Sequence, residues 1–256
     1  MTVGLVLSGG GARGIAHLGI IKALQEQGVQ IDRIAGTSAG AVAGALLATG
    51  YSPDEILEIV VTTPFFRHVR PAFNRMGLLK LDRVEALYRT YLPEDRFEAL
   101  KIPLHVVATD INAGECVVFE EGELVRPLVA SCCLPGIFAP YQIGDRQYVD
   151  GAVLNNMPVE MLENKVDFII GASCNPPNPN KSITSVKGVL ERSLMLAIRS
   201  KTRERLTKCD LLVEPPDLCR YEVFDLRKAR EIFRVGYEYT RTMEIDLFKL
   251  TTPSAP

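Results

Sequence analysis

The 256-residue sequence predicts an α/β fold of three layers, α/β/α, in which helices cover both faces of a largely parallel central sheet. Short apolar runs alternate with longer segments of helical periodicity, an order typical of parallel sheets. Glycine-rich turns follow the first two apolar runs, where such sheets place their functional loops. The hydrophobic share of 47% is enough for a sizeable core in a chain of this length.

The first 50 residues contain two strand–turn–helix units. Val3 to Leu7 is predicted to be a strand, and Ile15 to Gln27, with apolar residues at helical spacing, the helix that follows it. Ile31 to Ala35 is predicted to be the second strand, and Ala41 to Thr49 a helix of small residues that stops at Gly50. The glycine turns therefore lie between each strand and its helix.

The same alternation continues through the rest of the chain. Further helices are predicted at Pro53 to Thr62, Leu81 to Tyr91, Glu123 to Ala130, Thr184 to Lys208 and Leu226 to Leu247. Further strands are predicted at Leu104 to Ala108, Cys116 to Phe119, Phe168 to Ala172 and Leu211 to Val213, with a short one ending at Asp150. We expect one domain over residues 1–250 and a disordered tail at residues 251–256.

Composition and charge exclude several classes of function. A net charge of -2 and a sequence pI near 6.0 give no reason to expect a nucleic-acid partner. The three histidines, His17, His68 and His105, and six cysteines without a C-x-x-C pair predict no metal site. We expect no secretory leader before the first strand, and no apolar stretch approaches the ~20 residues of a membrane span. We therefore expect reduced thiols and a cytoplasmic protein whose membrane contact, if any, is peripheral and at the inner face.

The first glycine turn has more than one interpretation. Gly9, Gly11 and Gly14 match the G-x-G-x-x-G of dinucleotide-binding folds, which also need an acidic residue at the carboxyl end of the second strand. Asp32 stands at the beginning of that strand, which counts against a dinucleotide. The loop can instead aim backbone N–H groups and a helix N-terminus at an oxyanion, or it can be a tight turn without a ligand.

The second glycine turn contains a candidate nucleophile. Gly36 to Gly40 reads G-T-S-A-G, a G-x-S-x-G pattern in which small neighbours permit a strained turn that exposes the Ser38 hydroxyl. The alternative is that Ser38 merely caps the helix that follows. Because the two glycine turns follow consecutive parallel strands, we expect them to emerge at the same edge of the sheet.

The candidate base is a carboxylate, because no histidine follows His105. His105 lies inside a predicted strand, where a core histidine is the better interpretation, and the helical position of His17 indicates packing or capping. Asp150 lies where a short strand meets an Asp-Gly turn. An aspartate in a dry pocket, hydrogen-bonded to Ser38, can have its pKa raised enough to act as a base.

Four sequence blocks occur in order along the chain: Gly9-Gly10-Gly11-Ala12-Arg13-Gly14, Gly36-Thr37-Ser38-Ala39-Gly40, Ala130-Ser131-Cys132-Cys133-Leu134-Pro135 and Asp150-Gly151-Ala152. They resemble the oxyanion block, the nucleophile elbow, the A-S-x-x-x-P block and the D-G-[GA] block of the patatin-like phospholipases. The resemblance covers nearly the whole chain, whose short length is similar to that of compact bacterial members.

The resemblance implies a patatin-like fold and a catalytic dyad of Ser38 and Asp150, with backbone amides around Gly10 and Gly11 as the oxyanion hole. It implies hydrolysis of fatty-acyl esters, with a lipid as substrate and without metal or cofactor. Phospholipase A, lysophospholipase and broader acyl-hydrolase activities all occur in the family. An acyltransferase, or a module that binds lipid or protein without turnover, stays open.

The segment from Pro64 to Lys80 is a candidate lipid contact. It holds four cations and no acidic residue, with apolar residues between them. The cations are Arg67, Arg70, Arg75 and Lys80, and the apolar residues are Phe65, Phe66, Val69, Phe73, Met76 and Leu78. The segment can be a surface loop packed on the domain, a lid over the pocket, or a seat on an anionic bilayer.

Overall fold

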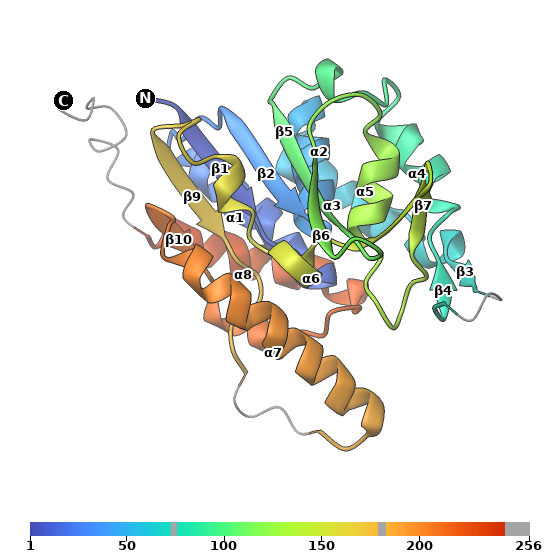
Figure 1. Cartoon of the computed structure of the whole chain (residues 1–256). Helices are drawn as coiled ribbons and strands as arrows, with labels where there is room; N and C mark the ends of the chain where they lie inside the picture. Colours follow the sequence, from blue (N-terminus) through green and yellow to red (C-terminus); the bar gives the residue numbers. More distant parts are fainter. Residues whose placement is uncertain (73–75, 179–182, 244–256) are drawn as a thin grey trace.

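The computed structural model describes residues 1–72, 76–178 and 183–243 (Figure 1). Within them the central sheet has eight strands: β1 (Val3–Leu7), β2 (Arg33–Thr37), β5 (Leu104–Asp110), β6 (Glu115–Phe119), β7 (Tyr141–Ile143), β8 (Arg146–Asp150), β9 (Phe168–Ala172) and β10 (Leu211–Val213). Their spatial order is β10-β9-β1-β2-β5-β8-β7, with β6 paired to β5 outside this order. The strands from β10 to β5 run parallel, whereas β6, β7 and β8 pair in the antiparallel sense. The prediction of a largely parallel sheet is confirmed.

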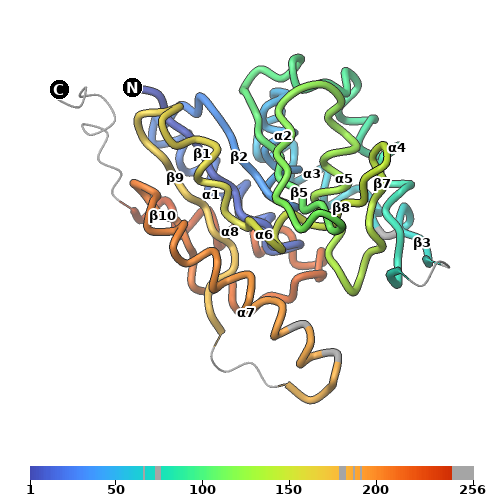
Figure 2. Tube along the Cα trace, in the orientation of Figure 1, coloured from blue at the N-terminus to red at the C-terminus, as the bar shows by residue number. Residues whose placement is uncertain are grey.

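Helices cover both faces of this sheet, as predicted. They are α1 (Ala16–Glu26), α2 (Ala39–Thr49), α3 (Pro53–Thr62), α4 (Val84–Tyr91), α5 (Val125–Ser131), α6 (Ala152–Asn155), α7 (Val186–Leu206) and α8 (Ala229–Arg241). Figures 1 and 2 show α6 and α7 on one face, with α1 and α8 on the other. Short 3-10 helices lie at Gly11–Ile15, Phe65–His68, Phe97–Ala99, Val159–Met161, Pro216–Arg220 and Leu226–Lys228, and β3 (Arg70–Pro71) pairs with β4 (Leu79–Lys80) apart from the main sheet.

The core follows from the alternation of side chains along the strands. All five residues of β1 are buried, as expected for a strand covered on both faces. Leu5 and Leu7 belong to the larger core, which includes Leu18 of α1. Val6 points to the opposite face and belongs to a smaller core with Leu206 of α7. The two cores together hold the sheet between its helix layers.

Most predicted elements lie where the sequence placed them, and β1, β9, β10 and α3 have the predicted bounds. The second strand lies two residues later than predicted, at Arg33–Thr37. Asp32 forms two hydrogen bonds with Val3 at the start of β1. Its N–H donates to the Val3 carbonyl (2.8 Å), and its carboxylate accepts from the Val3 N–H (2.7 Å). The last helix ends at Arg241, and residues 244–247 of the predicted helix lie outside the described residues, as does the predicted tail.

The register of the parallel strands determines where the two glycine turns meet. β1 and β2 are neighbours and pair in parallel, with Leu7 opposite Gly36. The turns that follow them therefore emerge at the same edge of the sheet, which confirms the prediction. The strand order reverses at β1, the position where open α/β sheets form their ligand crevice.

Two broader predictions concern the chain as a whole. Helix α8 returns to pack on α1 so closely that a Cβ on Gly19 would collide with the Phe233 carbonyl. One domain over residues 1–250 stays a prediction. No helix in the described part of the chain combines the length and apolar character needed to cross a membrane.

Candidate active site

Ser38 occupies a strained turn between β2 and α2. Its backbone has φ 54° and ψ -125°, a conformation that residues with a Cβ rarely adopt. The Ser38 N–H donates to the Ser131 hydroxyl (2.7 Å), which in turn donates to the Val107 carbonyl (2.7 Å). Ser131 thus holds the strained turn to the neighbouring strand β5. This is the geometry of a nucleophile elbow, which the G-x-S-x-G pattern predicted.

The glycines of the elbow are required by close packing. A Cβ on Gly36 would lie 2.7 Å from the Ala41 Cα, and a Cβ on Gly40 would collide with the Leu7 carbonyl at the end of β1. Helix α2 can begin immediately after Ser38 only because these two side chains are absent. The elbow positions Gly36 and Gly40 thus have the packing role that the sequence assigned to small neighbours.

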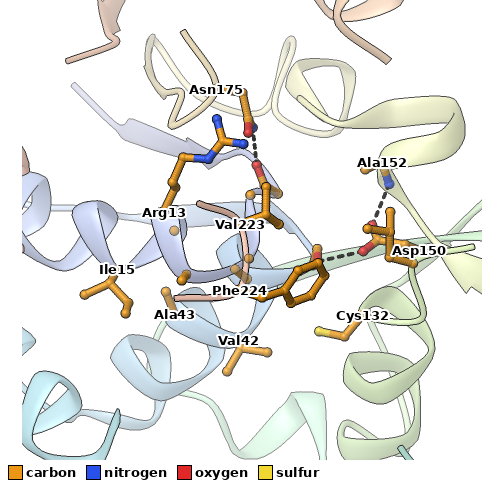
Figure 3. Close-up of a pocket in the computed structure, with 18 of the residues that line it drawn as sticks. Arg13, Ile15, Val42, Ala43, Cys132, Asp150, Ala152, Asn175, Val223 and Phe224 are labelled. Atoms are coloured by element: carbon orange, nitrogen blue, oxygen red, sulfur yellow. Dashed lines mark hydrogen bonds between the residues drawn. The ribbon is translucent and has the colours of Figure 1, made fainter. Parts of the chain in front are cut away.

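Asp150 lies within hydrogen-bond distance of the candidate nucleophile. The Ser38 Oγ donates to the Asp150 Oδ2 at 2.7 Å, and the Ala152 N–H donates to the Asp150 Oδ1 at 2.9 Å (Figure 3). The Asp150 side chain is buried. Burial raises the pKa of Asp150 to about 7, although the hydrogen bonds from Ala152 and Ser38 lower it in part. The carboxyl group can therefore gain or lose a proton near neutral pH.

Strand β8 fixes the position of this carboxylate. Asp150 stands opposite Ala108 of β5, and its N–H donates to the Cys133 carbonyl at 2.9 Å. A Cβ on Gly151 would collide with the Val107 carbonyl, so the Asp-Gly turn can approach β5 only with glycine at this position. Strand β5 and the segment around Cys133 thus hold Asp150 next to Ser38, which is far from it in the sequence.

The glycine loop lies directly against the elbow. A Cβ on Gly9 would lie 3.1 Å from the Ser38 Cβ. The Gly9 N–H donates to the Asn156 Oδ1 (3.1 Å) and the Ala12 N–H to the Val223 carbonyl (2.6 Å), so neither is free for a ligand. Gly10 and Gly11 precede and begin the 3-10 helix, where N–H groups have no partner within the helix, and no other described residue accepts from them.

The remaining members of the block have different surroundings. Gly14 packs on α2, where a Cβ would lie 2.6 Å from the Ala39 Cβ. Arg13 lines the pocket, and its Nε is buried without a hydrogen-bond partner among the described residues. Of the six predicted residues Gly9, Gly10, Gly11, Ala12, Arg13 and Gly14, Gly9 and Ala12 have N–H groups bonded elsewhere, whereas those of Gly10 and Gly11 have no acceptor among the described residues.

The three histidines lie away from this pair. His17 is buried in α1, with its Nε2 2.8 Å from the Ser8 carbonyl oxygen, and burial lowers its pKa to about 4. His105 is buried in β5 with its Nε2 2.7 Å from the Glu120 carboxylate. His68 lies in the 3-10 helix Phe65–His68. None of the three lines the pocket, and the packing roles predicted for His17 and His105 are confirmed.

The candidate dyad opens into an apolar pocket with a volume of about 410 Å³. Its wall beside Ser38 includes Cys132, and burial raises the pKa of that thiol to about 12, so Cys132 stays protonated. Figure 3 shows Asp150 between Ala152 and Cys132, with Arg13 and Asn175 across the pocket. Most other lining side chains are aliphatic or aromatic, among them Val42, Leu46, Ile56, Ile59, Leu87, Tyr88, Phe138, Met195, Ile198 and Phe224. The pocket beside Ser38 and Asp150 is thus lined mainly by apolar side chains.

The segment from Pro64 to Lys80 packs on the domain in part, which is one of its three predicted roles. Phe65 lines the pocket, and Val69 packs on the larger core. Leu78 is exposed (63%), whereas Arg70 forms an ion pair with Asp82 and is not available as a free cation. Phe73 and Arg75 lie outside the described residues, and the side chain of Phe66 is not described. A lid and a membrane seat both stay open for this segment.

Several residues that shape the site had no assigned role in the sequence. Ser131 belonged to the A-S-x-x-x-P block, but its bond to Ser38 spans 93 positions of the chain. Asn156 orients the glycine loop, and the Asn175 amide donates to the Gly9 carbonyl. Asn175 follows β9, the neighbour of β1, so the rule that polar residues at parallel strand ends gather at one edge could have indicated it.

Comparison with known proteins agrees with the fold and the blocks. The family model described as patatin-like phospholipase matches residues 5–163. An uncharacterized NTE family protein of Mycobacterium tuberculosis is 36% identical over 177 residues, which are 68% of this chain and 49% of the relative. The lysophospholipase NTE1 of Kluyveromyces lactis is 28% identical over 283 aligned positions, 93% of this chain and 19% of that protein.

Among solved structures, VipD from Legionella pneumophila has a TM-score of 0.54 and 17% identity, and the match covers 93% of this chain and 66% of VipD. This likeness shows the fold. The chain spans half or less of the length of the curated relatives above. The family model covers well over half of the chain and includes the glycine loop, the elbow, Ser131 and Asp150. The chain therefore belongs to the patatin-like phospholipase family.

Proposed function

We propose that this chain is a serine lipid acyl-hydrolase of the phospholipase A or lysophospholipase type, with Ser38 as nucleophile and Asp150 as base. The observation that carries the proposal is the 2.7 Å hydrogen bond from the Ser38 hydroxyl to a buried carboxylate that lines a largely apolar pocket. The family and the name of the lysophospholipase among the relatives support a lipid ester as substrate.

In the first half of the reaction, Asp150 accepts the proton of the Ser38 hydroxyl as its oxygen attacks the ester carbonyl. The tetrahedral intermediate collapses to an acyl-serine, and the leaving alcohol takes the proton from Asp150. In the second half, Asp150 accepts a proton from water, the resulting hydroxide attacks the acyl-serine, and Ser38 regains its proton as the fatty acid leaves. The pKa of about 7 suits both directions of transfer at neutral pH.

The N–H groups of Gly10 and Gly11 are the proposed donors to the oxyanion. They lie in a loop packed against Ser38, and their neighbours Gly9 and Ala12 already donate to other acceptors. Donors of this kind, held before the reaction begins, typically contribute about 100- to 1000-fold in rate each. The apolar wall of the pocket is the proposed site of the acyl chain.

The proposal is tested by a hydrolysis screen of p-nitrophenyl esters and phospholipids, with Ser38→Ala as the matched control. Turnover that disappears in Ser38→Ala supports it. Covalent labelling of Ser38 without turnover of any ester would instead support a binding module. Transfer of the acyl group to an added alcohol in preference to water would support an acyltransferase.

We expect the rate of short-chain ester hydrolysis to rise with pH up to about pH 7 and then level off. The base must be unprotonated, and burial raises the pKa of Asp150 to about 7. Below that pH the rate constant kcat/KM should fall about tenfold per pH unit. A profile from pH 5 to pH 9, recorded where the protein stays folded, checks this. A rate that is already level at pH 5 would contradict a base whose pKa is raised to about 7.

Arg13 is the proposed contact for the phosphate of a lipid head group. Its Nε is buried without a partner in the described part of the chain, and buried donors of this kind are normally satisfied by an acceptor. We expect Arg13→Gln to lower kcat/KM at least about tenfold more for a lysophospholipid than for p-nitrophenyl butyrate. Arg96→Gln, at an exposed arginine outside the pocket, is the control and should lower neither. Equal losses of both substrates in Arg13→Gln would contradict the phosphate contact.

A further inference from the structure

Helix α7 carries a row of exposed apolar side chains. Val186, Val189, Leu190 and Leu196 are 79%, 53%, 67% and 52% exposed. Their spacing places them on one side of the helix, and we call this row the α7 stripe. Figures 1 and 2 show the first half of α7 extending beyond the sheet. Large apolar side chains that are exposed together on one side of a helix point to a surface for interaction.

The α7 stripe is continuous with the mouth of the pocket. Leu196 belongs to the stripe and also lines the pocket, as do Arg192, Met195 and Arg199 on the adjoining side of the helix. Phe224, another pocket residue, is 39% exposed. A surface that covers the stripe would therefore lie at the entrance to the cavity that holds Ser38.

The charge around the stripe favours an anionic partner. From Val186 to Leu206 the sequence has six lysines or arginines and two glutamates. Arg199 and Arg205 pair with carboxylates, whereas Lys201 and Arg203 are exposed and form no ion pair with any described residue. Apolar side chains flanked by cations are typical of helices that lie in the interface of an anionic bilayer. The same cations would repel one another if two copies of α7 met face to face.

We propose that the α7 stripe inserts into the interface of an anionic lipid bilayer, with α7 parallel to the membrane surface and the pocket mouth facing it. The catalytic purpose of this contact rests on the proposed function, because a lipid could then enter the pocket without crossing water. The contact itself does not depend on turnover. The charges of α7 are compatible with a helix that lies on the membrane and does not cross it.

The test measures sedimentation of the Ser38→Ala protein with vesicles of phosphatidylcholine containing phosphatidylglycerol, at low salt. The inactive background keeps the vesicles intact. We expect Val186→Ser, Val189→Ser and Leu190→Ser together to lower the partition coefficient at least about tenfold. The matched control, Val61→Ser with Ile111→Ser, removes apolar side chains that are 41% and 46% exposed elsewhere and should change it less than about twofold.

Removal of two positive charges on α7 tests the membrane contact independently of the apolar side chains. Lys201→Gln with Arg203→Gln should lower sedimentation with the anionic vesicles at low salt and leave that with pure phosphatidylcholine unchanged. In the active background, the triple serine variant should hydrolyse p-nitrophenyl butyrate at the parent rate, since its three residues lie outside the pocket wall. Binding through the stripe by a protein that hydrolyses nothing would remove the proposed function and leave this inference standing.

Three results would overturn the inference. The first is unchanged sedimentation of the triple serine variant, with circular dichroism confirming that it is folded. The second is loss of sedimentation only when Met76→Ser and Leu78→Ser are introduced, which would place the contact in the segment from Pro64 to Lys80. The third is a parent dimer that the triple variant converts to a monomer in analytical ultracentrifugation, which would make a second copy the partner of the stripe.

Discussion

Asp150→Asn is expected to lower kcat for a short-chain ester by about 100- to 10,000-fold, the range typical of losing a general base. Asparagine keeps the shape of the side chain and can still bond to Ser38 and to the Ala152 N–H, but it cannot accept a proton in the relevant pH range. A larger loss would mean that the geometry around Ser38 had changed as well. Initial rates with p-nitrophenyl butyrate, on protein of verified fold, measure the effect.

The thermal stability of Asp150→Asn shows whether its loss of activity comes from the missing base or from a disturbed fold. The folded pKa of Asp150, about 7, lies above its ordinary value of 3.8, so between these pH values the folded protein holds a proton that the unfolded chain lacks. The stability from that proton is fully present below the ordinary pKa and is lost as pH rises through about 7. Asp150→Asn buries no charge, so we expect it to melt at a temperature equal to or above that of the parent at pH 8, with the difference shifting in favour of the parent at pH 5.

Histidine variants test whether the reaction needs a histidine in addition to, or in place of, Asp150. A protein with His17→Gln, His68→Gln and His105→Gln should retain a measurable fraction of the parent rate if it folds. The contact of His105 with Glu120 makes some loss of stability expected, so circular dichroism accompanies the assay. If a folded His17→Gln protein is as inactive as Asp150→Asn, a histidine-assisted reaction replaces the dyad.

Local pattern was sufficient to predict the parallel half of the sheet. The runs that became β1, β9 and β10 are short, apolar and bounded by polar or glycine residues, so their burial on two faces could be read from composition. The edge strand β7 was not predicted. It has three residues, and of these Tyr141 is buried and Gln142 exposed, a pattern too short to separate from a loop. Its pairing with β8 depends on the turn between them.

The sequence was enough to predict the site residues that lie next to strand ends. It was not enough to predict the features that depend on contacts between residues far apart in the sequence. Ser38 and the glycine turns lie next to strand ends, so the sequence places them at one edge. The amide of Gly9 looks the same in the sequence as that of Gly10, and only the folded position of Asn156 shows that Gly9 is already bonded. The raised pKa of Asp150 likewise results from burial by residues distant in the sequence.

Ser38→Ala is expected to lower hydrolysis by at least about 10,000-fold, because it removes the oxygen atom of the proposed nucleophile. Alanine differs from serine only by the hydroxyl, so the strained backbone at this position and the bond from its N–H to Ser131 are retained. We therefore expect an unchanged fold. Hydrolysis by Ser38→Ala within about tenfold of the parent rate would show that another group attacks the ester.

The most direct test is the reaction of a fluorophosphonate with the protein, followed by intact mass and peptide mapping. A serine activated beside an oxyanion hole attacks phosphorus as it attacks an ester carbonyl. The expected result is one adduct, on Ser38, that is absent from Ser38→Ala and forms far more slowly in Asp150→Asn. An adduct that forms on Ser38→Ala at the parent rate would contradict Ser38 as the nucleophile.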